Sequence, residues 1–341
     1  MPDRRQLKIL HGPSNVASVA SVLARAQRAR GLNAHAVCHT PGRGVSPDFV
    51  LGQRGSAGKR FVPFLLTEFP GYDVFHFYYD ETYFGRSFGE INALQKLGKK
   101  VVLTFLGCDV RDAKKELQKT TPTMCQDCWP AGCSRNRMQL LAAAKKADAV
   151  FVTTPDLLEY VPNAKWLPLP AAADLIPMHS ARPREWTLED PLTVFHAPTD
   201  PQKKGTIYLQ AAIEKLAAAG RPIRLTLAQE AGQEEIWQQA IVCDVAVDQI
   251  LAGVYGTFGA EMMLAGLPLI NRIDESVWSE SPSGIINADP NTIEAVLTQV
   301  LDGQIDLKAA ASAAKAYAAR HNAEIVSTQF DAIYESRGEP V

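Results

Sequence analysis

Short apolar runs alternate with amphipathic segments along the first half of the chain. The apolar runs predict strands over 7–10, 34–38, 74–77, 101–105, 149–153 and 166–169. Apolar residues spaced three and four apart predict helices over 16–30, 86–98 and 135–147, the first of them capped by Ser14 or Asn15. Strands that alternate with helices favour a parallel, doubly wound α/β sheet, whose ligands bind beyond the carboxyl ends of the strands.

The same alternation returns after a proline-rich stretch. Prolines and charges without periodicity over 168–191 indicate a linker. Beyond it the pattern predicts strands over 192–196, 223–228, 243–247 and 267–270. It also predicts helices over 206–219, 232–240, 256–265, 290–302 and 307–337, the last of them rich in alanine. We therefore expect two Rossmann-like domains that face a central cleft, over 1–175 and 191–320, with a linker over 176–190. The C-terminal helix over 321–341 is expected to cross back to the first domain.

Composition and charge narrow the class of protein. The 341 residues are 46% hydrophobic, which is enough for two cores and excludes a disordered chain. Lys and Arg number 35 against 37 Asp and Glu, so the basic excess of a nucleic-acid-binding protein is missing. No apolar run reaches the ~20 residues of a transmembrane helix, and the N-terminal run is too short for a signal peptide. These features predict a cytoplasmic protein without a transmembrane segment.

Three segments follow predicted strands and open predicted helices. After the first strand, the small residues Gly12, Ser14 and Asn15 form a turn that could present backbone N–H groups to an anion, or could be an ordinary capped turn. After strand 192–196, Lys203, Lys204 and Gly205 could contact a phosphate, although lysines in such a loop are often only solvated.

The third segment is a glycine-rich turn over 253–259 that enters a helix carrying Glu261. Its N–H groups and helix dipole suit a diphosphate, and the Glu261 carboxylate could accept hydrogen bonds from ribose hydroxyls. A surface glutamate that complements the helix dipole is the simpler alternative. The apolar character of the rest of the helix favours a Glu261 that faces the cleft.

These segments, in this order, resemble the GT-B glycosyltransferases, in particular the family 4-like bacterial enzymes. The matching segments are the Gly12–Asn15 turn, 72–76, 107–111, 196–206 and 248–268. The resemblance implies retaining, metal-independent transfer of a sugar from a nucleotide-diphosphate donor, with no cofactor for catalysis. It implies a sugar or glycolipid acceptor on the first domain, and leaves peripheral membrane contact open.

The resemblance also assigns residue roles. Lys204 would bind the diphosphate, Glu261 would bind the donor ribose, and Asp109 would lie on the acceptor side of the cleft. The donor would also contact the turn made of Tyr255, Gly256, Thr257 and Phe258.

Three positions depart from the family pattern. Gly253 stands where such enzymes carry the first of two glutamates seven residues apart, Thr199 to Pro201 occupy the place of an arginine, and Leu106 replaces a histidine. The departures support an alternative hypothesis, a catalytically silent relative that binds a nucleotide sugar or glycan as a sensor or partner.

Four of the six cysteines fall in one short window. Cys125, Cys128 and Cys133 follow a CxxCx4C pattern, and Cys108 lies seventeen residues before the first of them. Four thiolates could hold a structural zinc ion, and free thiols or a labile disulfide are the alternatives.

Overall fold

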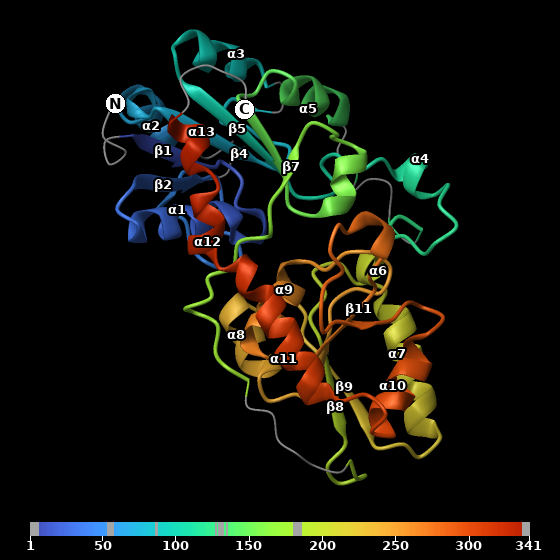
Figure 1. Cartoon of the computed structure of the whole chain (residues 1–341). Coiled ribbons are helices and arrows are strands. Elements are labelled where there is room, and N and C mark those ends of the chain that lie inside the picture. Colours follow the sequence, from blue (N-terminus) through green and yellow to red (C-terminus); the bar gives the residue numbers. More distant parts are fainter. Residues whose placement is uncertain are drawn as a thin grey trace. The chain divides into compact units, whose positions relative to one another are not determined.

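A computed structural model of the chain describes residues 7–52, 58–85, 88–126, 128, 133, 136–179 and 186–335. These residues form two compact units (Figure 1). The first unit takes its residues from within 1–112, 133–172 and 321–341, and the second from within 113–132 and 173–320. The contiguous domain ranges expected from the sequence differ from this division mainly at 113–132, which belongs to the second unit.

The first unit contains a parallel sheet of seven strands, counted over the described residues, in the order β3-β2-β1-β4-β5-β6-β7. Its strands are β1 (Lys8–His11), β2 (Asn33–Cys38), β3 (Phe49–Val50), β4 (Val74–Tyr78), β5 (Lys100–Phe105), β6 (Ala149–Val152) and β7 (Lys165–Trp166). Its helices are α1 (Val19–Ala29), α2 (Gly58–Thr67), α3 (Gly89–Lys96), α5 (Arg137–Ala144), α12 (Ala323–Thr328) and α13 (Asp331–Glu335).

Both faces of this sheet are buried. Neighbouring residues of β4 alternate between two apolar clusters, with Phe75 in one and Val74 in the other. Since side chains of a strand point to opposite faces in turn, the clusters lie on the two sides of the sheet. This explains why the strands read as continuous apolar runs.

The second unit contains a parallel sheet of five described strands in the order β12-β11-β10-β8-β9. Its strands are β8 (Leu192–His196), β9 (Ile223–Leu227), β10 (Val245–Val247), β11 (Leu269–Asn271) and β12 (Ile286–Asn287). Its helices are α4 (Ala113–Glu116), α6 (Pro201–Lys204), α7 (Thr206–Ala218), α8 (Gln233–Ala240), α9 (Thr257–Ala265), α10 (Ile293–Leu301) and α11 (Leu307–Ala318). The α/β class and the doubly wound parallel sheets predicted from the sequence are confirmed.

Two helix predictions are wrong in detail. The helix expected over 16–30 begins at Val19, because Ala17 and Ser18 adopt left-handed backbone conformations and interrupt the first turn. The helix expected over 307–337 is divided into α11, the 3-10 helix η7 (Ala319–His321), α12 and α13. The Asn322 side chain accepts a hydrogen bond from the backbone N–H of Glu324 at 2.9 Å and thereby starts α12 as a new helix.

The C-terminal helices α12 and α13 belong to the first unit and lie beside α1, as the red and dark blue ribbons in Figure 1 show. Phe330, Ile333 and Tyr334 are buried in the same cluster as residues of α1 and β4. None of the helices in the described residues is long and apolar enough to cross a membrane.

Candidate functional site

Two loops of the second unit carry the predicted donor residues. One loop follows β8 and leads into α6, and the other follows β10 and leads into α9. β8 and β10 are neighbours in the sheet, with His196 opposite Val247, so both loops begin at the same edge. The sheet therefore brings together residues that lie about fifty positions apart in the sequence.

Lys204 is the last residue of α6. Asp200 caps α6 by accepting a hydrogen bond from the backbone N–H of Lys203 at 3.3 Å, and Gly205, with φ of 78°, ends the helix in a left-handed conformation. The Lys204 ammonium group donates to Asp248 Oδ1 in an ion pair. The Lys204 side chain is 14% exposed, whereas that of Asp248 is fully buried.

Asp248 joins Lys204 to the first turn of α9. Its second oxygen, Oδ2, accepts a hydrogen bond from the backbone N–H of Gly256 at 2.6 Å, and Gly256 is the N-cap of α9. A Cβ atom at Gly259 would lie 2.8 Å from the same oxygen, so a residue with a side chain would displace this carboxylate. No role was predicted for Asp248 from the sequence, although an acidic residue directly after a buried strand was a signal that could have identified it.

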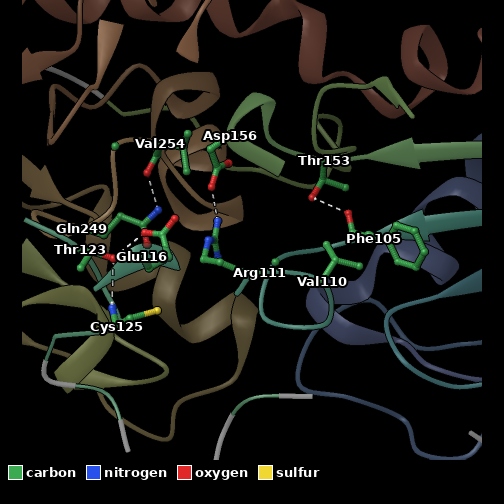
Figure 2. A network of polar contacts seen from close by, with 12 residues as sticks. Phe105, Val110, Arg111, Glu116, Thr123, Cys125, Thr153, Asp156, Gln249 and Val254 are labelled. Carbon is green, nitrogen blue, oxygen red and sulfur yellow. Dashed lines mark hydrogen bonds and ion pairs between the residues drawn. The ribbon is translucent and has the colours of Figure 1, made fainter. Parts of the chain in front are cut away.

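The loop between β10 and α9 is held from within by Gln249. Its side-chain amide donates to the carbonyl of Val254, as Figure 2 shows, and its backbone N–H donates to Asn271 Oδ1 at 3.1 Å. Tyr255 is buried and stacks on Trp278, with ring centroids 5.2 Å apart. Tyr255 therefore contributes its backbone, and not its ring, to the surface of this turn.

Glu261 lies in α9 and is only 5% exposed. Oε2 accepts a hydrogen bond from Trp237 Nε1 at 2.9 Å, and Oε1 accepts one from Gln233 Nε2. Burial raises the pKa of Glu261 from 4.5 to about 7, against the opposite effect of these two hydrogen bonds. The carboxyl group is therefore poised between its acid and its ionised form near neutral pH.

At Gly253, the position of the first family glutamate, the structure leaves no room for a side chain. A Cβ atom there would lie 2.4 Å from the Asp274 Cβ atom and 3.2 Å from Arg272 Nη1. Arg272 and Asp274 pair at 3.6 Å. The neighbouring pair of Arg272 and Asp274, which was not predicted from the sequence, therefore requires glycine at 253.

The remaining predicted donor residues lie on α6 and at the start of α9. Lys203 pairs with Asp200 at 3.0 Å, and the Phe258 ring centroid lies 5.9 Å from the Lys204 ammonium nitrogen. Thr257 is the first residue of α9. Lys203 thus has a carboxylate partner on its own helix.

In the predicted turn of the first unit, the Asn15 side chain binds backbone groups of the chain itself. Asn15 Nδ2 donates to the carbonyls of Pro41 and Val45, and its Oδ1 accepts from the backbone N–H of Ser21 at 3.2 Å. Gly12 has φ of 145°, and a Cβ atom there would lie 2.1 Å from the Val37 carbonyl oxygen. Ser14 lies between them in the sequence and is partly exposed.

Asp109 is completely buried within its own loop. Its carboxylate accepts hydrogen bonds from the backbone N–H groups of Leu106, Gly107 and Val110 at 2.9, 2.7 and 3.1 Å. Burial raises its pKa from 3.8 to about 6, against these bonds. In the same loop, the Arg111 side chain points to Asp156 and forms an ion pair with it (Figure 2). This geometry suits a loop-holding role for Asp109.

The predicted structural zinc site is not supported. Among the described residues, which include all four cysteines, no group of three or more His, Cys, Asp or Glu side chains is placed to hold a metal ion. Cys108 and Cys133 belong to the first unit, and Cys125 and Cys128 to the second. None of the cysteines takes part in a disulfide. The segment that carries Cys125 is instead organised by Glu116, which accepts a hydrogen bond from the Thr123 hydroxyl at 2.6 Å (Figure 2).

No protein-family model matches the chain, and a comparison with curated proteins gave no significant match. Solved structures with the same fold cover nearly the whole chain. A sucrose-phosphate synthase from Thermosynechococcus elongatus superimposes with a TM-score of 0.64 at 14% identity, over 97% of this chain and 96% of that one. HepE from Anabaena, solved in complex with UDP-glucose, has a TM-score of 0.60 at 12% identity, over 95% and 98%.

A third similar structure is WaaG, a glycosyltransferase involved in lipopolysaccharide biosynthesis. It has a TM-score of 0.55 at 14% identity, over 96% of this chain and 98% of that one. At such low identities the likeness concerns the fold alone. Together with the two parallel-sheet units, it shows that the chain has the GT-B, Rossmann-like α/β fold.

Proposed function

We propose that the chain is a glycosyltransferase that moves a sugar from a nucleotide-diphosphate donor to a sugar or glycolipid acceptor. The observation that carries the proposal lies within the second unit. There Asp248 connects an ammonium group, that of Lys204, to the first turn of α9, and Glu261 projects from the second turn of the same helix. A cation, a helix N-terminus and a carboxylate are the groups that a diphosphate and a ribose require.

In this proposal Lys204 and the first backbone N–H groups of α9 bind the diphosphate. These N–H groups have no partner inside the helix and point along its positive end. The backbone of Tyr255 to Phe258 forms the surface around these N–H groups. Gly205 ends α6 directly after Lys204. Glu261 binds the ribose. The structural similarity to HepE, whose structure holds UDP-glucose, supports a nucleotide sugar as the donor.

Catalysis would follow from the same groups. As the bond between sugar and diphosphate breaks, negative charge grows on the leaving diphosphate oxygen. Lys204 and the α9 N–H groups stabilise that charge, which is worth several kcal/mol when the donors are already in place. The positive charge comes from the chain, so the proposed transfer is metal-independent and, as in family 4-like enzymes, retaining.

The first unit is proposed to receive the acceptor, near the Gly12–Asn15 turn and the 107–111 loop. Asp109 would act there by holding its loop, because three backbone N–H groups already occupy its carboxylate.

Turnover of nucleotide sugars tests the proposal. Release of nucleoside diphosphate from a panel of UDP-, ADP- and GDP-sugars should be at least tenfold slower with Lys204→Ala than with wild type. Lys215→Ala is the matched control, since Lys215 is an exposed lysine that pairs with Glu294 at the surface of the same unit. Equal rates for all three proteins on every sugar that is turned over would overturn the role of Lys204.

One observation favours a second candidate function, nucleotide-sugar binding without transfer. Asp274 fills the space at Gly253, so the chain lacks the first glutamate of the family pair and cannot accommodate one. Tight binding of a nucleotide sugar together with no release of nucleoside diphosphate, with any acceptor supplied, would favour this candidate.

A further inference from the structure

The Glu261 carboxylate is held by two side chains of α8, a helix to which the sequence assigned no role. Trp237 Nε1 donates to Oε2 at 2.9 Å, and Gln233 Nε2 donates to Oε1. The two residues lie four positions apart and therefore share one face of α8. Each carboxylate oxygen thus has one donor from the same helix.

The two donors differ in how firmly they are held. Trp237 is a buried ring, 5% exposed, inside the helix. Gln233 is the first residue of α8 and is partly exposed. Its carbonyl oxygen Oε1 is buried and accepts no hydrogen bond from any residue that the structure describes. The Gln233 amide is therefore only half satisfied where it lies, and can leave by rotation at the end of a helix.

Access to Glu261 requires one of these donors to move. Only 5% of the residue is exposed, so the two donors that cover the carboxylate leave no open approach for a ligand hydroxyl in this arrangement. Removal of Trp237 would break its packing and one hydrogen bond. Removal of Gln233 breaks one hydrogen bond and brings its unpartnered carbonyl to water, where it gains partners.

We propose that a ribose hydroxyl binds Glu261 by replacing the Gln233 amide at Oε1, while Trp237 stays bound to Oε2 and keeps the carboxylate in position. One N–H···O bond is exchanged for one O–H···O bond, so the buried carboxylate keeps two donors throughout. Trp237 is then a positioning residue and Gln233 an exchangeable one. The inference rests on the proposed function, because it takes a nucleotide ribose as the ligand of Glu261.

Calorimetric titration of single variants separates the two roles. UDP, ADP and GDP are first compared on wild type. The nucleotide that binds most tightly is then titrated into each variant, together with its 2′-deoxy and 3′-deoxy forms. We expect wild type to prefer the intact ribose by about tenfold or more over at least one deoxy form, as a hydrogen bond to a charged group requires. Trp237→Phe should bring the ratio of the two affinities, that for the intact nucleotide over that for the deoxy form, close to one. Gln233→Leu should bind the intact nucleotide severalfold more tightly and keep the ratio.

Gln239→Leu is the control, because Gln239 is a partly exposed residue of α8 whose side chain bonds Glu235 and not Glu261. In wild type, the hydrogen bond from Trp237 lowers the pKa of Glu261. Trp237→Phe loses that bond, so the pKa of Glu261 and the pH midpoint of nucleotide binding should both move upward. A change of packing that brought water to Glu261 would lower its pKa and move the midpoint downward instead. The Gln233→Leu result remains decisive if Trp237→Phe does not fold.

The inference is overturned if Gln233→Leu weakens binding and reduces the ratio, or if folded Trp237→Phe keeps the ratio of wild type. Failure of the proposed function looks different. In that case wild type binds none of the three nucleoside diphosphates.

Discussion

Asp248 is a buried carboxylate that organises the partly exposed Lys204 and the first turn of α9. Its two oxygens take the Lys204 ammonium group and the Gly256 N–H group, and it is fully buried. A buried charge is stable only when it is paired and hydrogen-bonded, and here both conditions are met within one loop. Lys204 thereby has a fixed position before any ligand arrives.

Asp248→Asn should therefore weaken both the fold and nucleotide binding. The amide replaces the ion pair by a weaker bond and leaves the Lys204 charge without its partner, so we expect a loss of about 1–3 kcal/mol in the free energy of unfolding. Urea denaturation measures it. Asp302→Asn, which removes an exposed pair with Arg221, should change stability by less than about 1 kcal/mol. Equal stability of the two variants would contradict this role of Asp248.

The ionisation of Glu261 predicts how binding depends on pH. Burial raises its pKa to about 7 in the folded protein, above the ordinary value of 4.5. The folded state thus binds the extra proton between about pH 4.5 and 7, and this group makes the fold less stable as pH rises through that window. If ribose binds the carboxylate, affinity should rise about tenfold from pH 6 to 8.

Titrating nucleotide against wild type and Glu261→Gln at several pH values measures this dependence. Because glutamine does not ionise, the pH dependence that remains in the variant comes from the titration of the diphosphate itself. A pH dependence that is the same in both proteins would remove Glu261 from the ribose site.

The residues predicted from the sequence were those that lie in a local motif. Lys204 and Glu261 follow a strand and a glycine-rich turn, so their neighbourhood in the chain indicated their place. Asp248, Gln233 and Trp237 act through contacts made 24 to 44 positions away in the sequence. No local pattern specifies which strand or helix will bring such partners together.

At the scale of elements, the first turn of α9 depends on glycine. A Cβ atom at Gly259 would lie 2.8 Å from Asp248 Oδ2 and 3.1 Å from the Tyr255 Cβ atom. Alanine is the better helix former by about 1 kcal/mol, but the clash falls on the carboxylate that holds Lys204. We expect Gly259→Ala to lower nucleotide affinity at least tenfold and to destabilise the protein. Gly71→Ala, whose nearest neighbour is the Lys8 Nζ atom at 3.9 Å, should be tolerated. Unchanged affinity in Gly259→Ala would contradict this account of the turn.

Long periodic elements were predictable and short or interrupted ones were not. The strands β1, β4, β5 and β8 are continuous apolar runs and were found close to their observed bounds. β3 and β12 have two residues each, too few to show a period. The break after α11 depends on the side-chain cap by Asn322, whereas alanine content predicted one long helix. The structural zinc ion predicted from cysteine spacing is not supported among the described residues, because spacing along the chain does not show whether the thiols come together in the fold.

At the scale of the whole molecule, the last described residues complete the core of the first unit. Phe330 is 1% exposed and contacts the rings of His76 and Phe151 at centroid distances of 5.0 Å. Tyr334 accepts a hydrogen bond from Gln27 of α1 at 3.0 Å, and Lys100 donates to the Ile333 carbonyl at 2.7 Å. The first unit is therefore built from both ends of the described chain.

Phe330→Ala should destabilise the first unit by about 3–5 kcal/mol, because a buried aromatic side chain is replaced by a cavity. Thermal unfolding measures the stability of the first unit, and nucleotide binding at the same temperatures reports whether the second unit is still folded. Binding to the second unit should persist below the lowered transition. Ile325→Ala, at a position on α12 that is 49% exposed, is the control. A transition temperature equal to that of wild type would show that the C-terminal helices add nothing to this core.

We propose that the second unit binds the diphosphate of a nucleotide sugar through Lys204 and the first turn of α9. The most direct test is calorimetric titration of UDP, ADP and GDP into wild type, Lys204→Ala and Lys215→Ala. We expect wild type and Lys215→Ala to bind one of these nucleotides with equal affinity, and Lys204→Ala to bind it at least tenfold more weakly. Absence of binding to wild type, or equal affinity in all three proteins, would contradict it.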